Sequence, residues 1–214
     1  MSELKVAFEM RLSEMNPLKH VQLAYNVVSD TAFNNDVIAK YRKIIKLLVL
    51  KERDFIESGK LPEGLHPIVA GFPTGFFAYL FDPIKAKKYL TDHEIQPIKL
   101  PTKQLIRYID QQQLDPINRF EEYDKNAPII ILDSPLFNHP FCICGNLNIA
   151  EAKRMKKGKL NVYYLFTDDY LHLMFDDLSK AMHMFHMDLH ELSDNAHPRL
   201  DELYISKIND YITI

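Results

Sequence analysis

The fold expected for this chain depends most on residues 124–166, DKNAPIIILDSPLFNHPFCICGNLNIAEAKRMKKGKLNVYYLF. Runs rich in β-branched and aromatic residues, at 128–132 and 162–165, predict strands. Between them lie a second strand that ends at Gly145-Asn146 and a short helix that ends before Gly158. The amides at the start of that helix favour anions, so this turn is the first candidate for a ligand site.

Composition restricts the classes of protein to consider. With 214 residues, 47% of them hydrophobic and 26% charged, the chain is typical of a folded soluble protein. A net charge of −3 and a pI of about 6.3 disfavour nucleic acid and anionic membranes as partners. The only cysteines, Cys142 and Cys144, alternate along a predicted strand and cannot bridge each other. Together with an N-terminus that lacks a secretory signal, this predicts a cytoplasmic protein that does not span a membrane.

The order of predicted elements indicates an α+β fold. Residues 4–58 read as two amphipathic helices, the second beginning near Asn34 or Asn35. We expect an N-terminal helical region over residues 1–90 and an α/β domain with a long C-terminal helix over residues 91–214, with one compact unit as the alternative. Asp82-Pro83 predicts a helix start, residues 96–100 a strand, and Pro101-Thr102 a further helix.

Residues 61–83 are apolar but interrupted by proline and glycine, so they do not predict a membrane span. Residues 71–75, GFPTG, allow two interpretations. A buried crossing between elements is favoured, because no titratable group converges there. A loop that contacts a ligand is the alternative.

Residues 96–166 resemble the ParB N-terminal/sulfiredoxin-like superfamily. The family typically shows a short strand, a strand of the form P-I-x-V, a strand that runs into a glycine, a helix with small residues and a closing strand. The corresponding segments of this chain, in the same order, are Ile98–Leu100, Pro128–Ile131, Phe141–Asn148, Ala150–Ala152 and Val162–Leu165. The resemblance implies a small mixed sheet whose nucleotide phosphates are held beside the helix N-terminus.

The residues that perform the family's chemistry are replaced in this chain. The family's His-Arg pair after the glycine corresponds to Leu147-Asn148, and the catalytic cysteine of the sulfiredoxin-type enzymes corresponds to Asn146. The chain therefore lacks the cation that makes the strong charge-assisted contact with phosphate. What remains is a helix N-terminus, and Gly145, Asn146, Asn148 and Ile149 are the residues we expect to hold an anion there.

Cys144 stands just before that helix, and His139 lies five residues upstream. A helix N-terminus can lower the pKa of a thiol and make it reactive. A small buried hydrophobic residue at the end of a strand is the more frequent role of an intracellular cysteine, and we favour it.

Thr167-Asp168-Asp169 predicts the start of a long helix that runs to about Leu192. His183, His186 and His190 share one face of it, at spacings that can bind zinc. Each of these histidines directly follows an apolar core residue, and residues in such positions share a face by helical geometry alone. Histidines at the edge of the core, with partly buried rings, are therefore the favoured interpretation. A pH-sensitive contact is a further interpretation.

The sequence favours a non-catalytic binding or regulatory protein that requires no cofactor, with a nucleotide-like anion or a protein as its partner. Two alternatives remain open: a phosphohydrolase or metal-dependent hydrolase that uses His183, His186 and His190, and an immunity or anti-defence protein of a mobile element. A homodimer is also compatible with the sequence.

Overall fold

A computed structural model describes residues 19–20, 28–57, 64–72, 75–114, 123–137, 139–194 and 198–213. The chain forms two compact units, and each is described by itself. Unit 1 comprises residues 1–63, 67–80 and 174–214, and unit 2 comprises residues 64–66 and 81–173. The sequence prediction grouped residues 91–214 together, whereas the structure groups the C-terminal helix with the N-terminal one.

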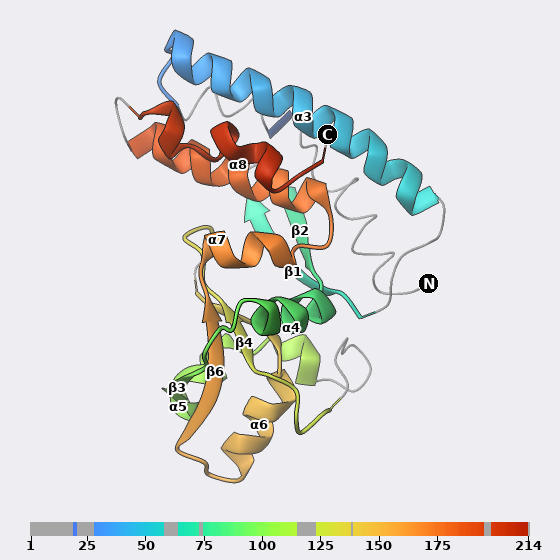
Figure 1. Cartoon of the computed structure of the whole chain (residues 1–214), viewed down its shortest axis with the longest axis vertical. Coiled ribbons are helices and arrows are strands. Elements are labelled where there is room, and N and C mark those ends of the chain that lie inside the picture. The colour runs from blue at the N-terminus through green and yellow to red at the C-terminus, as the bar shows by residue number, and fades with distance from the viewer. Residues whose placement is uncertain are drawn as a thin grey trace. The chain divides into compact units, whose positions relative to one another are not determined.

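Unit 1 combines helices with a two-stranded sheet. Its elements are α3 (Ala32–Glu57), most of β1 (His66–Phe72) and of β2 (Gly75–Phe81), α8 (Asp177–Asp194), and the 3₁₀ helices η5 (Leu200–Glu202) and η6 (Tyr204–Asp210). Figure 1 shows α8 lying along α3, and η6 contacts both helices. Their apolar faces meet in the core of the unit.

The prediction of a helix beginning near Asn34 is confirmed as α3, which starts two residues earlier. The Thr31 Oγ1 accepts a hydrogen bond from the Asn34 backbone N–H at 3.1 Å, as expected of an N-cap residue. The Asn34 side chain donates to the Ser29 carbonyl at 3.0 Å. Buried side chains recur at helical spacing along the following turns: Val37, Ile38, Tyr41, Ile45 and Leu48. The helix predicted before α3 lies mainly outside the described residues.

Residues 66–72 and 75–81 form two paired strands, whereas the sequence favoured a buried crossing with no strand assigned to it. The prediction underestimated the strand signal because Pro67 and Gly71 interrupt it. β2 is buried from Phe77 onward, and the Tyr79 hydroxyl lies 2.8 Å from Nδ1 of His186 on α8. Pro73 and Thr74, in the middle of the alternative ligand loop, lie outside the described residues.

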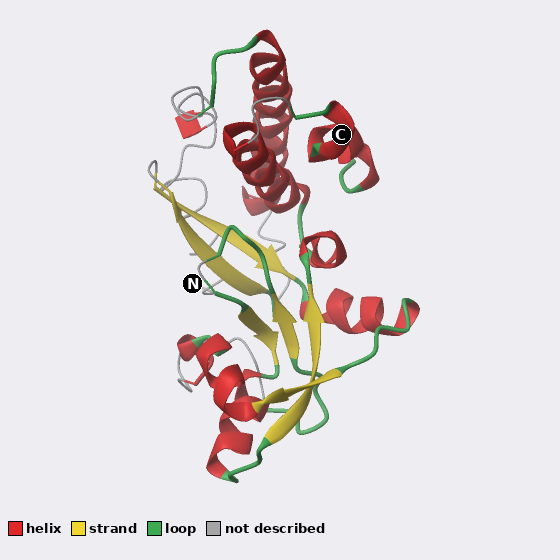
Figure 2. Cartoon of the chain, turned by 90° about the vertical axis from the view of Figure 1, so that its left-hand side faces the viewer, coloured by secondary structure: helices red, strands yellow, loops and turns green. Residues whose placement is uncertain are grey.

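Unit 2 contains a four-stranded mixed sheet in the order β3-β6-β4-β5, visible in Figure 2. β6 pairs antiparallel with β3 and parallel with β4, and β4 pairs antiparallel with β5. The strands are β3 (Ile98–Pro101), β4 (Ile130–Leu132), β5 (Phe141–Cys144) and β6 (Lys159–Leu165). The helices are α4 (Pro83–Asp92), α5 (Thr102–Leu105), η2 (Ile106–Tyr108), η3 (Gln111–Leu114), α6 (Asn146–Arg154), α7 (Thr167–Tyr170) and η4 (Leu171–Leu173).

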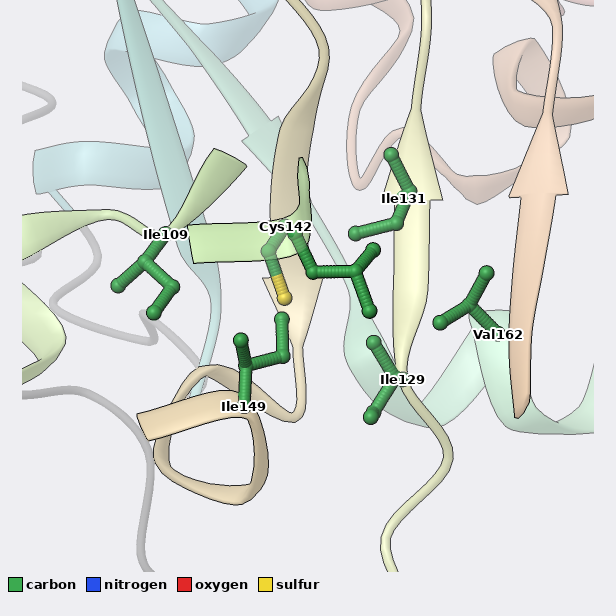
Figure 3. Close-up of a cluster of buried hydrophobic side chains, with 7 residues drawn as sticks. Ile109, Ile129, Ile131, Cys142, Ile149 and Val162 are labelled. Atoms are coloured by element: carbon green, nitrogen blue, oxygen red, sulfur yellow. The ribbon is translucent and has the colours of Figure 1, made fainter. Parts of the chain in front are cut away.

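One face of this sheet is sealed by an apolar cluster, shown in Figure 3, to which α5, α6 and three strands contribute. Its buried members are Leu105, Ile109, Ile129, Ile131, Cys142, Ile149 and Val162. Burial at about 25 cal/mol per Å² of apolar surface makes such a cluster the main source of the unit's stability. The cluster fixes where α6 begins relative to the sheet.

The long helix predicted from Thr167 to Leu192 is wrong in one respect, because the structure divides it. α7 and η4 end at Leu173, and α8 starts at Asp177. The Phe175 backbone N–H donates to the Leu80 carbonyl of β2 at 2.7 Å. This N–H therefore does not form the hydrogen bond that would continue a helix. The Asp176 carboxylate then accepts from the Ser179 backbone N–H at 2.7 Å and begins α8 anew.

The α+β class expected from the sequence is confirmed. Asp82 caps α4 as predicted, accepting from the amides of Ile84 and Lys85. The helix expected after Pro101 forms as α5 and continues as η2, and the backbone becomes extended at Ile109. The C-terminal segment forms 3₁₀ helices. In the described part of the chain, no helix has both the length and the apolar character needed to cross a membrane.

Candidate functional site

Gly145 sets the geometry of the predicted ligand site. It is the residue before α6 and has a φ of 87°, in the left-handed region that glycine tolerates best. A Cβ at this position would stand 2.8 Å from the Ile129 side chain and 3.0 Å from the Pro128 carbonyl oxygen. The chain therefore needs glycine here to bring α6 against β4.

Asn146 joins three segments of unit 2. Its Oδ1 accepts from the Asp110 backbone N–H at 3.1 Å, and its Nδ2 donates to the Cys142 carbonyl at 3.1 Å. The side chain is fully buried. Asp110 in turn places a carboxylate oxygen 3.6 Å from Nε2 of His66, whose pKa burial lowers to about 4. Asn146 thus stabilises the start of α6 instead of facing solvent.

The other two predicted residues have different surroundings. Ile149 is fully buried in the apolar cluster of the sheet and is not available to an anion. Asn148 is only partly buried, and its Nδ2 donates to the Ala127 carbonyl at 3.1 Å. Its Oδ1 is covered by neighbouring atoms and accepts no hydrogen bond. Of the four predicted residues, Asn148 is the one that lines the open cavity beside α6.

That cavity is a hollow of about 410 Å³ beside α6, here called the α6 hollow. α6 lines it with residues at helical spacing, from Asn148 through Glu151 and Ala152 to Met155. The segment before β4 and the first half of β6 form the remaining walls. Its polar lining includes two cations, three amides and two phenols: Lys125, Lys157, Asn126, Asn148, Asn161, Tyr123 and Tyr163.

Glu151 is the carboxylate that lines the α6 hollow among the described residues, and it has a partner of its own. Arg154 donates to both of its oxygens, at 2.8 and 2.6 Å. This hydrogen bonding, with the charges of Arg154 and Lys157, lowers the pKa of Glu151. Because Arg154 neutralises Glu151, Lys125 and Lys157 give the hollow a positive character.

Cys144 is buried, as is Cys142, and neither is part of a disulfide. The Cys142 Sγ lies 3.1 Å from the Cys144 carbonyl oxygen, within β5. The burial of Cys144 is what a packing residue at the end of a strand requires. A reactive thiol would need exposure that Cys144 does not have.

The histidines of the predicted metal face have unequal environments. His183 and His186 are buried in unit 1, whereas His190 is exposed. The two nitrogens of His186 already have partners: Nδ1 is 2.8 Å from the Tyr79 hydroxyl and Nε2 is 2.8 Å from Nε2 of His20. The Phe72 ring stacks on His186 with centroids 4.1 Å apart.

These contacts explain the electrostatics of the histidines. Burial lowers the pKa of His183 to about 3. Burial lowers the pKa of His186 well below its usual value as well, and the neighbouring His20 and His183 add to the effect. The rings are therefore neutral at physiological pH. Across the described residues, no group of three histidine, cysteine or acidic side chains is arranged to hold a metal ion.

Asp188 is a second buried polar group in unit 1. Its Oδ2 accepts from the Tyr41 hydroxyl at 2.6 Å and from the Ile205 backbone N–H at 2.9 Å. Its Oδ1 accepts from the Tyr204 backbone N–H at 2.7 Å. Burial raises its pKa to about 6, although these hydrogen bonds oppose the shift. Asp188 joins α3, α8 and η6.

Sequence reasoning identified the neighbourhood of the α6 hollow but missed most of its polar lining. Lys125, Lys157 and Asn161 come from three segments that converge only in the folded sheet. Lys156 and Lys157 follow the C-terminal end of α6, where lysines are common because their charge interacts favourably with the helix dipole. No local motif distinguishes such a lysine from one that faces solvent.

Comparison with known proteins gave no match to this chain from protein-family models, curated proteins or solved structures.

Proposed function

We propose that this protein is a non-catalytic binding module that takes a nucleotide-like anion in the α6 hollow. The resemblance of residues 96–166 to the ParB N-terminal/sulfiredoxin-like superfamily implies a nucleotide near the same helix, with its phosphates at the helix N-terminus, whereas the α6 hollow extends along the helix from Asn148 to Met155. The hollow's own side chains supply the argument, because the family's His-Arg pair is replaced by Leu147-Asn148.

The observation that carries the proposal is the pairing of an unsatisfied amide with two lysines in one hollow. The Asn148 Oδ1 is covered and accepts no hydrogen bond, which costs about 1–3 kcal/mol for a buried polar atom. Asn146, two residues away, has both ends of its amide bonded within the protein. Because that oxygen is covered, a ligand N–H reaches it only when the Asn148 side chain turns toward the hollow, and the ligand then supplies the missing donor.

The lining matches the mixed chemistry of a nucleotide. Lys125 and Lys157 are exposed cations suited to phosphate oxygens. The half-exposed Tyr123 offers an aromatic face for a base. The amides of Asn126 and Asn161 can both donate and accept, as base and ribose edges require. About 410 Å³ is within the range of small-ligand pockets.

The absence of catalysis is part of the proposal. The α6 hollow brings together no acid–base pair with free carboxylate oxygens among the described residues, since Glu151 is held by Arg154. A general base must reach the proton that it abstracts. The ligand would therefore be bound and released unchanged, and binding would regulate contact with another molecule.

A thermal-shift titration of the full chain with ATP, CTP and GTP, with and without magnesium, tests the proposal. A ligand that binds only the folded state raises the melting temperature with its concentration. We expect at least one nucleotide to do so. The double variant Lys125→Gln/Lys157→Gln should remove most of that shift.

The matched control is Lys87→Gln/Lys88→Gln, which removes the same two charges from an exposed face of α4. It should keep the wild-type shift. If no nucleotide raises the melting temperature of the wild type, the small-ligand function is wrong. If both double variants lose the thermal shift equally, the shift depends on the overall charge of the protein and not on the α6 hollow, which would also contradict the proposal.

A further inference from the structure

Unit 2 contains a second hollow, lined by Pro101, Lys103, Gln104, Arg107, Tyr108 and His139 and here called the α5 hollow. Its volume is about 520 Å³. α5 and η2 form one wall, and the loop before β5 contributes His139. None of these residues belongs to the α6 hollow.

The cations of the α5 hollow lie on one face of a helical turn. Lys103 and Arg107 are four residues apart, so α5 and η2 present them side by side. Both are exposed, and no carboxylate among the described residues pairs with either or lines the hollow. In a chain with a net charge of −3, this is a local concentration of positive charge.

Hydrogen bonds within the hollow fix the orientation of its neutral groups. The Gln104 Nε2 donates to the Tyr108 hydroxyl oxygen at 2.8 Å, which directs the phenol's own O–H to another acceptor. The His139 Nδ1 donates to the Pro140 carbonyl at 3.0 Å. The ring of His139 also packs on Phe141, with centroids 4.6 Å apart. Because Nδ1 is occupied, Nε2 is the ring nitrogen of His139 that can form a hydrogen bond with a ligand.

We propose that the α5 hollow is a binding site for the phosphate group of a small phosphomonoester. Arg107 presents a planar set of donors that fits two phosphate oxygens, and Lys103 adds a point charge beside it. The Tyr108 hydroxyl donates to a third oxygen. The Nε2 of His139 accepts a hydrogen bond from a protonated oxygen of the phosphate group. This site is separate from the nucleotide site proposed in the α6 hollow.

The test is an NMR titration of the full chain with inorganic phosphate, which follows the side-chain resonances of Tyr108 and His139. We expect saturable shifts with a dissociation constant on the order of millimolar, which corresponds to about −4 kcal/mol for a single phosphate group. Sodium chloride at matched ionic strength should not reproduce them.

The double variant Lys103→Gln/Arg107→Gln should raise the dissociation constant for phosphate at least about tenfold, because charge-assisted contacts dominate such a site. Both side chains are exposed, so the variant should retain the wild-type circular dichroism and melting temperature. Lys87→Gln/Lys88→Gln should stay within about twofold of the wild type.

Three results would overturn the proposal: shifts that grow linearly without saturation, shifts that sodium chloride reproduces, or equal weakening in the two double variants. The outcome is independent of the nucleotide experiment, because Lys125→Gln/Lys157→Gln leaves the α5 hollow intact. That variant should bind phosphate in the α5 hollow as the wild type does.

Discussion

In unit 1, the polar side chains of His20, Tyr79 and His186 bond one another out of reach of solvent. In unit 2, Lys103, Arg107, Lys125 and Lys157 line hollows that are open to it. The two regions differ in where the hydrogen bonds of their polar side chains end. Polar groups bonded within the protein stabilise the fold, whereas polar groups with unused bonding capacity in a hollow are available to a ligand.

The same contrast applies to α8, whose three histidines could bind zinc by their spacing alone. Its rings are neutral and packed against aromatic side chains such as Phe72. A zinc ligand must present a free ring nitrogen, and both nitrogens of His186 are already in contact with other groups. The proposed ligand chemistry accordingly belongs to unit 2.

The largest expected effect is on the buried carboxylate of unit 1. Asp188→Ala removes the acceptor of the Tyr41 hydroxyl and of two backbone amides, and leaves three donors unsatisfied. We expect the free energy of unfolding to fall by about 3–5 kcal/mol in urea denaturation. Asp188→Asn retains one acceptor oxygen and should cost less. A loss below about 1 kcal/mol for the alanine variant would show that these bonds do not carry the packing of unit 1.

Gly145→Ala should have the next largest effect, in unit 2. The added Cβ would meet Ile129 at 2.8 Å and require a φ of 87° in an alanine. We expect a loss of about 2–4 kcal/mol from the strained backbone and the steric overlap combined. The control is Gly158→Ala, where the Cβ has open space and no positive φ is required, so stability should change by less than about 1 kcal/mol. Equal losses in both variants would contradict the role given to Gly145.

The pH dependence of unfolding should follow the buried histidines. Their folded pKa values lie below the unfolded value of 6.5, to about 3 for His183, so the unfolded state binds more protons below pH 6.5 and stability falls with the pH. Asp188 acts in the opposite direction, because its pKa rises from 3.8 to about 6 on folding. The buried His66, whose pKa is lowered to about 4, acts in the same direction as His183 and His186. Three such histidines outweigh one carboxylate, and we expect a net loss of about 3 kcal/mol between about pH 7 and pH 5.5.

Urea denaturation at a series of pH values measures this slope. His183→Gln keeps a polar side chain but cannot titrate, so its stability should fall less steeply with acid than that of the wild type. A stability that rose on acidification would show that Asp188 dominates instead.

Local signals account for the parts of the fold that could be predicted from the sequence. The Asp82-Pro83 start of α4 and the apolar stripe of α3 depend on neighbours within a turn or two. The break before α8 could not be predicted in the same way, because the Phe175 amide bonds to Leu80, 95 positions earlier in the chain. The α6 hollow likewise needs β6 beside β4, and this pairing is non-local.

The candidate site shows the same limit at the level of single residues. Gly145, Asn146, Asn148 and Ile149 are adjacent in sequence and were expected to share one role. The structure gives them a turn with a positive φ, a buried polar link, a wall of the hollow and a core position, in that order. Helical geometry turns successive side chains through about 100°, so neighbours in a helix rarely face the same surroundings.

The smallest expected effect on stability separates the two asparagines of this turn. Asn148→Ala removes one hydrogen bond, to the Ala127 carbonyl, together with an oxygen that has no partner. The gain from deleting the unsatisfied acceptor offsets the lost bond, so the free energy of unfolding should change by less than about 1 kcal/mol. Asn146→Ala leaves both the Asp110 amide and the Cys142 carbonyl unsatisfied, and should cost about 2 kcal/mol or more.

Urea denaturation gives both values, and the nucleotide titration supplies the second readout. Asn148→Ala should weaken the nucleotide-induced thermal shift at nearly unchanged stability, because a residue that serves the ligand matters when the ligand is present. If Asn148→Ala destabilises the protein as much as Asn146→Ala does, Asn148 belongs with the structural polar groups and the α6 hollow loses its main argument.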